Sequence, residues 1–421
     1  MARLSRRSFL QTAAASAAAA RLAQSHSAQP ARAAQSAPDV VVVGAGAFGG
    51  WTALHLREMG HAVTLVDAYG PGNGRAASGG ETRQIRVGYG DQEIYSRWVL
   101  RALEKWKARE EEFGESLLLR TGRLQLASAW TEELSATRRV FEKLGVAHEV
   151  VSHDELSKRH SQMRPEGVEF ALFEPGAGVM RARHAMQVVA RAFEKKGGRF
   201  QIGRAEPPPE SGSTLSRLSL GDGRGLSAGA YVFACGPWLP KVFPELLGRK
   251  IFTPRRDTFF FGTPAGDDRF DHPNLPNFAD VGYYGFASID GRGFKVCPQG
   301  EQVAFDPDLD ERVHNAYLLE RARAFLAHRF PDLQDQPLLE SRVCQTEMSV
   351  DEHFIVQKHP RWDNVWIAGG GSGHAFKHGP VVGEYVARRV AGTDLEPELE
   401  AMFRIKAETF DASVFSGARR Y

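Results

Sequence analysis

A glycine-rich turn near the start of the chain constrains its fold more than any other feature. Three glycines follow the apolar run 40–43 with the spacing Gly44-x-Gly46-x-x-Gly49. In such a turn the first glycine permits the tight bend and the second lets the backbone approach a pyrophosphate, while the third lets the next helix pack on the strand. The pattern predicts a strand, a turn and a helix whose N-terminus offers free N–H groups to phosphates.

The residues that follow complete a β-α-β unit. We expect a helix over 51–59, ended by Gly60, and a second strand over 62–66. Asp67 stands at the carboxyl end of that strand, where a carboxylate binds ribose hydroxyls and disfavours a 2′-phosphate. The unit predicts a bound dinucleotide other than NADP, but the turn alone does not separate FAD from NAD.

Length and composition narrow the class of protein. The 421 residues suit two domains of ordinary size. Hydrophobic residues at 42% and charged residues at 25% are typical of a soluble globular protein. The net charge of +2 predicts no nucleic-acid partner, and no window is apolar enough to predict a stable membrane span. We expect no metal, because too few cysteines are present for a metal site or a disulfide framework: Cys235, Cys297 and Cys344.

Residues 1–37 are interpreted as an export signal and spacer. The segment 5–10 (SRRSFL) has the twin-arginine pattern, and an alanine-rich stretch and small residues follow it. The alternative is an alanine-rich helix or a disordered tail. Because the twin-arginine export machinery carries folded proteins, the pattern predicts a protein that acquires its cofactor in the cytoplasm. It would then be exported to the periplasm or secreted.

The rest of the chain alternates between helical and strand patterns. Further strands are expected over 122–127, 147–151, 230–234 and 365–368, with antiparallel strands within 258–305. Helices are expected over 94–112, 184–197, 316–329 and about 380–391. A second glycine-rich run, 369–373, follows the last of the buried strands. Two such turns, one near each end, predict that the first and last segments meet in one parallel sheet, with a second domain between them.

Three segments resemble a known family. They are 77–86 (ASGGETRQIR), Cys344 with the later 351–355 (DEHFI), and 373–377 (GHAFK). In this order they resemble the monomeric sarcosine oxidase and N-methyltryptophan oxidase group of the D-amino-acid oxidase superfamily, over about residues 39–393. The group also holds pipecolate and fructosyl-amino-acid oxidases. The resemblance implies that the dinucleotide is FAD and that the chain is an FAD-dependent oxidoreductase.

The resemblance also implies the fold. We expect an α/β chain with a Rossmann-like FAD-binding domain and an α+β substrate domain whose sheet is mostly antiparallel. The FAD-binding domain would comprise residues 38–118, 177–250 and 345–396. The substrate domain would comprise 119–176 and 251–344, and residues 397–421 would form a C-terminal tail.

The resemblance places these residues at the cofactor: Gly44, Gly46, Ala47, Phe48, Gly49, Asp67, Ser78, Thr82, Arg83, Cys344, Gly373, His374, Ala375, Phe376 and Lys377. Cys344 matches the cysteine that forms a thioether to the flavin 8α-methyl group. That chemistry requires a thiolate, which nearby positive charge favours, and Arg342 is the nearest basic residue in sequence. The alternative for Cys344 is a buried, inert thiol. Cys235 and Cys297 are interpreted as structural.

Four residues are implied to take part in catalysis. Arg86 and Lys377 match the two positions that bind the substrate carboxylate, where together they fix and orient a small anion. Lys295 matches a lysine near flavin N5 that stabilises negative charge on oxygen. Tyr284 matches an active-site tyrosine, whereas we expect Tyr283 to pack in the core.

Two positions depart from the sarcosine oxidase pattern. That enzyme has histidines where this chain has Gly79 and Gln299, although His374 remains. The differences weaken the case for sarcosine itself as the substrate and predict a differently shaped or less basic pocket.

The expected function is an exported oxidase of a secondary or N-alkylated amino acid. Hydride transfer to flavin N5 would give an imine, and reoxidation by oxygen would give hydrogen peroxide. A flavin dehydrogenase that passes electrons to a quinone or carrier is one alternative. A non-catalytic periplasmic ligand-binding protein and an NAD enzyme are the others.

Overall fold

The computed structural model describes residues 39–209, 212–300, 302–393 and 396–416, so the predicted export signal lies outside the described residues. Residues 38–421 form one compact unit. None of the helices within the described ranges combines the length and apolar character that crossing a membrane requires.

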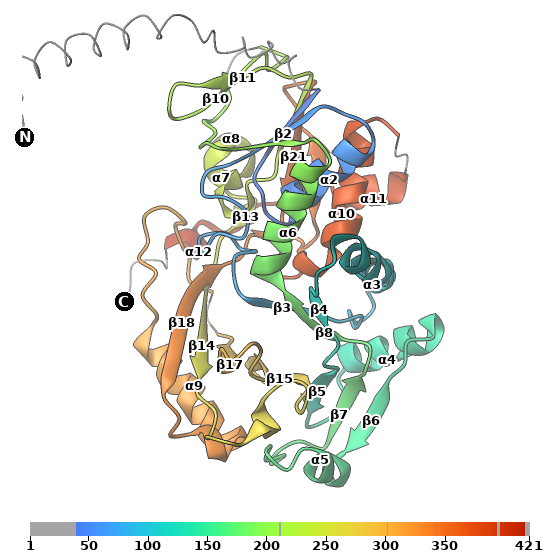
Figure 1. Cartoon of the computed structure of the whole chain (residues 1–421), viewed down its shortest axis with the longest axis vertical. Coiled ribbons are helices and arrows are strands. Elements are labelled where there is room, and N and C mark those ends of the chain that lie inside the picture. The colour runs from blue at the N-terminus through green and yellow to red at the C-terminus, as the bar shows by residue number, and fades with distance from the viewer. Residues whose placement is uncertain (1–38, 210–211, 301, 394–395, 417–421) are drawn as a thin grey trace, which may run out of the picture. The chain divides into compact units, whose positions relative to one another are not determined.

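A six-stranded sheet joins segments from both ends of the chain (Figure 1). Its order is β20-β21-β12-β1-β2-β9, and every neighbouring pair is parallel except β20–β21. The strands are β1 (Val40–Val43), β2 (Val63–Asp67), β9 (Arg199–Ile202), β12 (Ala230–Phe233), β20 (Ile355–Lys358) and β21 (Val365–Gly369). The prediction that the first and last segments share one parallel sheet is therefore confirmed.

Alternate side chains of β1 enter cores on opposite faces of this sheet. Val40 and Val42 pack in a cluster with residues of α2 (Ala47–Glu58), α6 (Ala182–Lys195) and α10 (Gly379–Val390). Val41 and Val43 pack in another with residues of α7 (Leu239–Val242) and α8 (Pro244–Leu247). Burial on both faces explains why β1 consists only of valine, since parallel strands covered on both sides are apolar throughout.

Helix α2 begins four residues earlier than the sequence predicted. It starts at Ala47, so that Gly49 lies inside its first turn. A Cβ on Gly49 would lie 1.9 Å from the carbonyl oxygen of Gly44. The early start therefore depends on glycine, because any side chain at this position would push the helix away from the turn.

An eight-stranded sheet carries the second core. Its order is β18-β14-β17-β16-β15-β5-β7-β6, and all its pairs are antiparallel except β15–β5. The strands are β5 (Arg123–Ala127), β6 (Glu149–Ser152), β7 (Phe170–Glu174), β14 (Arg255–Phe261), β15 (Asn277–Asp280), β16 (Tyr283–Phe286), β17 (Phe294–Pro298) and β18 (Leu338–Gln345). Helix α9 (Ala316–Arg329), whose bounds match the prediction, packs its Phe325 against Phe278 in this core.

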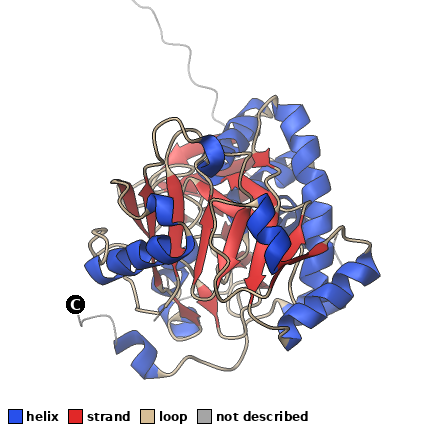
Figure 2. Ribbon diagram, turned by 90° about the horizontal axis from the view of Figure 1, so that it is seen from below, coloured by secondary structure: helices blue, strands red, loops and turns tan. Residues whose placement is uncertain are grey.

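Smaller elements complete the fold. A three-stranded sheet is formed by β3 (Thr82–Ile85), β8 (Gly178–Arg181) and β4 (Leu118–Leu119), and two-stranded sheets by β10 (Leu218–Ser219) with β11 (Gly225–Leu226) and β13 (Ile251–Phe252) with β19 (Met348–Ser349). The remaining helices are α3 (Glu93–Phe113), α4 (Glu132–Leu144), α5 (His153–Arg159), α11 (Pro397–Met402) and α12 (Ala412–Ser416). Figure 2 shows helices on the outer sides of the strands. The fold class predicted from the sequence is confirmed.

The strands of the two sheets alternate along the chain. Those of the six-stranded sheet lie within 40–67, 199–233 and 355–369, and those of the eight-stranded sheet within 123–174, 255–298 and 338–345. The bounds given above for the two domains stay a prediction.

Candidate active site

A cavity of about 930 Å³ opens at the carboxyl ends of the parallel strands. Gly44 after β1, Asp67 at the end of β2 and Ala234 after β12 line it there. Ligands of open α/β sheets bind at this edge. The cavity continues to the eight-stranded sheet, where Tyr284 of β16 and Arg123 of β5 form part of its wall. One cavity therefore spans the region between the two sheets.

The glycine turn forms a cradle for a phosphate group. Gly44 has a φ of +105°, and a Cβ there would lie 2.2 Å from the carbonyl oxygen of Ala234. Gly46 lines the cavity and precedes α2, whose N-terminus has no side-chain cap and no acidic residue in its first turn. Free N–H groups at a helix N-terminus attract anions. The backbone here fits the pyrophosphate of a dinucleotide.

Asp67 has a structural task in addition to its place in the cavity wall. Its Oδ2 accepts a hydrogen bond of 2.8 Å from the N–H of Ala45, and its Oδ1 accepts bonds of 2.8 Å from the N–H groups of Tyr69 and Gly70. Burial raises the pKa of Asp67, while these hydrogen bonds oppose the rise. The carboxylate thus holds the glycine turn against the end of β2, and its predicted contact with ribose stays a prediction.

The second glycine-rich run brings its predicted residues to the same cavity. Gly373 has a φ of +75°, and the four residues after it line the cavity: His374, Ala375, Phe376 and Lys377. Phe376 and Lys377 belong to a short 3-10 helix, η4 (Phe376–His378). The Gly-His-Ala-Phe-Lys segment thus faces the same space as the first glycine turn, about 330 residues away in sequence.

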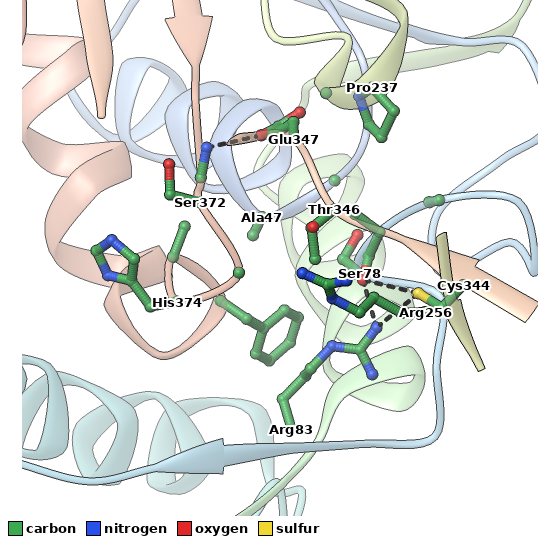
Figure 3. Close-up of a pocket in the computed structure, with 18 of the residues that line it drawn as sticks. Ala47, Ser78, Arg83, Pro237, Arg256, Cys344, Thr346, Glu347, Ser372 and His374 are labelled. Carbon is green, nitrogen blue, oxygen red and sulfur yellow. Dashed lines mark hydrogen bonds between the residues drawn. The ribbon is translucent and has the colours of Figure 1, made fainter. Parts of the chain in front are cut away.

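Cys344 lies on β18 beside two arginines (Figure 3). Its Sγ is 3.4 Å from Nη2 of Arg83, and Arg256 of β14 is its cross-strand partner. Arg342 instead pairs with Glu81 and Glu340. The positive charge beside the sulfur therefore comes from Arg83 and Arg256.

Lys377, Arg86 and Tyr89 form a cationic corner of the cavity. The Nζ of Lys377 donates to the Tyr89 hydroxyl at 2.7 Å and to the carbonyl of His374 at 3.0 Å. The Arg86 guanidinium lies over the Tyr89 ring, 4.8 Å from its centroid, and forms no hydrogen bond or ion pair with any described residue. Burial and the charges of Arg86 and Arg123 hold the pKa of Lys377 well below its usual value. This corner is suited to bind an anion.

Tyr89 is a site residue that the sequence analysis missed. Its hydroxyl also lies 3.1 Å from Nδ1 of His374 and 2.9 Å from Nε2 of His378. Burial and the charge of Lys377 lower the pKa of His374 to about 3, and they lower that of His378 as well. Both imidazoles are therefore neutral, and the positive charge beside Lys377 comes from the guanidinium groups of Arg86 and Arg123. The signal in the sequence was the short Gly-Tyr-Gly run after the flavin-loop segment.

Lys295 lies behind the wall of the main cavity. Its Nζ donates to Oγ1 of Thr82 at 3.0 Å, and Lys295 lines a second cavity of about 400 Å³. Thr82 and Phe286 line both cavities. Burial lowers the pKa of Lys295. The structure thus brings Lys295 next to the site without exposing it on the main cavity surface.

The two tyrosines of β16 have different surroundings. Tyr284 lines the main cavity, whereas the ring of Tyr283 stacks on Phe325 of α9, 4.2 Å between centroids. Cys297 is buried and borders the cavity, and the Sγ of Cys235 lies 3.7 Å from the carbonyl of Val43. All three cysteines are free thiols.

Gly79 and Gln299, the two positions where sarcosine oxidase has histidines, have different surroundings. At Gly79 a Cβ would lie 1.7 Å from the carbonyl oxygen of Asn73, so the backbone excludes a histidine there. Gln299 lines the cavity. Further lining residues were missed because isolated polar residues carry no spacing signal: Arg123, Arg256 and Glu347.

Glu347 is a buried acid in the half of the cavity next to the glycine turns. Its Oε1 accepts a hydrogen bond of 3.1 Å from the N–H of Gly371, and its Oε2 has no partner among the described residues. Figure 3 shows it between Pro237 and Ser372, away from Arg83 and Arg256. Burial raises the pKa of Glu347 to about 7. No cluster of His, Cys, Asp or Glu suited to a metal ion occurs in the part of the chain that the structure describes.

The parallel sheet, the glycine cradle and the cavity that reaches a second sheet define a class of dinucleotide-dependent oxidoreductases. The chain belongs to the family described as DAO, FAD dependent oxidoreductase, which matches residues 39–389. The predicted family and the predicted enzyme class are confirmed, and the dinucleotide is FAD.

Proteins named as amino-acid oxidases are similar to most of the chain. It is 30% identical over 362 residues to a monomeric sarcosine oxidase of Bacillus sp. (strain NS-129), covering 83% of this chain and 92% of that enzyme. It is 25% identical over 357 residues to an N-methyl-L-tryptophan oxidase of Yersinia pestis (strain Pestoides F), covering 83% and 94%. The structure of a thermally stable fructosyl peptide oxidase mutant shares the fold, with a TM-score of 0.78, 22% identity, and coverage of 90% of this chain and 96% of that one.

Proposed function

We propose that this protein oxidises a secondary or N-alkylated amino acid, with FAD as cofactor and oxygen as electron acceptor. The observation that carries the proposal is the cationic corner of Arg86 and Lys377, which shares one cavity with the glycine cradle. Relatives named sarcosine oxidase and N-methyl-L-tryptophan oxidase support it, since both names specify N-methylated amino acids.

The residues that would hold FAD include the two glycine-rich turns and the segment around Ser78 and Arg83, all of which line the cavity. Bound FAD would supply the two-electron chemistry by which the substrate amine becomes an imine, which water hydrolyses, and oxygen becomes hydrogen peroxide.

The cationic corner would bind and orient the substrate carboxylate. The fork of Arg86 offers two parallel N–H donors, and Lys377 adds a compact charge held by Tyr89. Because Lys377 is buried among cations, an anion placed there stabilises its charged form. A fixed carboxylate sets the direction of the neighbouring C–H bond, and orientation of this kind contributes strongly to rate.

We also propose that Cys344 forms a covalent bond to the flavin. The position of Cys344 supports this, because it lines the same cavity as the glycine cradle, with the guanidinium of Arg83 3.4 Å from its Sγ and Arg256 on the facing strand.

Lys295 supports oxygen as the acceptor, since a buried cation stabilises negative charge that develops on oxygen.

The dehydrogenase alternative is decided by assaying a panel of N-alkyl amino acids with and without oxygen. An oxidase forms one peroxide per amine oxidised in air, and under argon it stops after one reduction of its flavin. Turnover that proceeds under argon with a quinone or dye, without peroxide in air, would contradict the oxidase proposal.

Export through the twin-arginine route completes the proposal, based on the segment 5–10. Cell fractionation tests it: the wild type should be periplasmic or secreted, and replacement of both Arg6 and Arg7 by lysine should retain the protein in the cytoplasm. Equal distribution of the two would contradict it.

A further inference from the structure

Arg123 is a cation in the cavity wall that the proposed function does not use. It lies on β5, and its Nε is enclosed without a hydrogen-bond partner among the described residues. One Nη donates to the side chain of Gln125, which fixes the direction of the guanidinium. Burial and the charge of Arg86 lower the pKa of Arg123 to about 9, and at neutral pH the guanidinium is still charged.

The nearest acidic groups do not neutralise Arg123. Glu174 faces it across β5 and β7, but no ion pair joins the two in the described part of the chain. Oε1 of Glu174 instead accepts a hydrogen bond of 2.7 Å from the N–H of Val87, and Oε2 has no partner. Glu133 of α4 also lines the cavity, but it is exposed to solvent. Arg123 therefore faces the cavity as a charge without a carboxylate bound to it.

Cationic side chains outnumber buried acidic side chains at this end of the cavity. Arg86, Arg123 and Lys377 lie close enough that the first two lower the pKa of the third, and Glu174 is the buried acid among them. One substrate carboxylate bound at Arg86 and Lys377 would compensate only one of the two guanidinium groups, Arg86 and Arg123, that line this part of the cavity. A second carboxylate on the substrate would compensate the other, since buried charges are stable when they are paired.

We propose that Arg123 binds a second anionic group and that the substrate is a secondary amino acid with two carboxylates. This inference rests on the proposed function and narrows its substrate class. Arg86 and Lys377 bind the carboxylate next to the reacting carbon, and Arg123 binds the distal one. The planar fork of arginine matches a carboxylate with two parallel hydrogen bonds, which gives selectivity over a neutral side chain of equal length.

Binding of inert acids to the purified flavoprotein tests the proposal without turnover. Dicarboxylates and monocarboxylates of equal chain length are paired: succinate with butanoate, glutarate with pentanoate, and adipate with hexanoate. Calorimetry and the perturbation of the flavin spectrum give each Kd. We expect at least one dicarboxylate to bind about tenfold or more tightly than its partner. Equal affinities in all three pairs would overturn the proposal.

Variants assign the effect to one side chain. Arg123→Gln should remove the preference for the dicarboxylate, so that the two acids of each pair bind with Kd values within about twofold of each other. Arg123→Lys keeps the charge without the fork and should keep part of the preference. The matched control is Arg120→Gln, since Arg120 is an exposed arginine just before β5. A preference that survives in Arg123→Gln would contradict the assignment to Arg123.

Turnover measurements distinguish a failure of this inference from a failure of the proposed function. N-methyl-L-glutamate should exceed N-methyl-L-norvaline in kcat/KM by about tenfold or more, because the two differ mainly in the distal carboxylate. Equal kcat/KM values would overturn the substrate class while the oxidase function stands. Failure of every amine to reduce the flavin would instead contradict the proposed function, whatever the binding data show.

Discussion

Glu347 is a carboxyl group in an apolar and neutral setting. It accepts one backbone hydrogen bond and has no cation against it in the described residues. Burial raises its pKa from 4.5 to about 7, so the folded protein binds its proton more tightly than the unfolded chain does. The stability that this proton provides is complete below pH 4.5 and is lost as the pH rises to about 7.

Glu347→Gln should remove that loss of stability. Between pH 4.5 and 7 the free energy of unfolding of the wild type should fall relative to the variant by roughly 3 kcal/mol, the value for two to three pKa units. Chemical denaturation at several pH values measures it. If the free energy of unfolding had the same pH dependence in the two proteins over this range, Glu347 would not hold a proton in the fold.

Cys344→Ser tests the covalent bond at the same scale. Acid precipitation should leave the yellow flavin in the pellet of the wild type and release it into the supernatant of the variant. Cys297→Ser is the control, since Cys297 also borders the cavity and should keep its flavin in the pellet. Flavin released from the wild type would rule the covalent bond out.

At the scale of elements, the contact between α2 and the glycine turn depends on the absence of one side chain. Gly49→Ala would place a Cβ 1.9 Å from the Gly44 carbonyl oxygen, which must move the helix or the turn. We expect a loss of about 1–3 kcal/mol in stability and weaker FAD retention. Gly176→Ala is the control, because a Cβ there meets nothing within 4 Å, and it should change stability by less than about 0.5 kcal/mol. Thermal unfolding measures the stability of each variant, and its flavin content measures FAD retention. Equal stability and equal flavin content in the two variants would contradict the packing argument.

The elements that could be predicted were those with strong local signals. The strand of four valines, the glycine turn and α9 were predictable because each has a local signal: a run of apolar residues, a spacing of glycines and a helical periodicity, respectively. The helix α4 and the strands β3, β7, β8, β18 and β20 were not predicted. Several of these strands carry polar or charged residues on one face, so their pairing depends on distant partners rather than on a local pattern.

The site was predictable only in part, for a similar reason. Residues inside family motifs, such as Arg86 and Lys377, could be placed because the motif carries them. Arg123 lies in an ordinary alternating strand, and only the fold reveals that its face of the strand borders the cavity. The charge beside Cys344 likewise comes from Arg83 and Arg256, which are distant in sequence.

At the scale of the whole molecule, the cavity between the two sheets has two chemically different ends. The end at the parallel strands offers backbone N–H groups and glycines, whereas the other end gathers arginine and lysine side chains around Tyr89. With FAD held at the first end, the substrate carboxylate would be held at the cationic end. We therefore expect that the carboxylate, and not only the amine, is needed for reaction.

The most direct test is anaerobic reduction of the bound flavin. The purified protein is mixed under argon with an N-methyl amino acid or with the N-methyl amine that lacks its carboxylate, and the flavin absorbance is followed. We expect rapid bleaching by the amino acid and none by the amine, and much slower bleaching by the amino acid when Lys377 is replaced by methionine. Bleaching of equal rate by the amine and the amino acid would contradict this expectation.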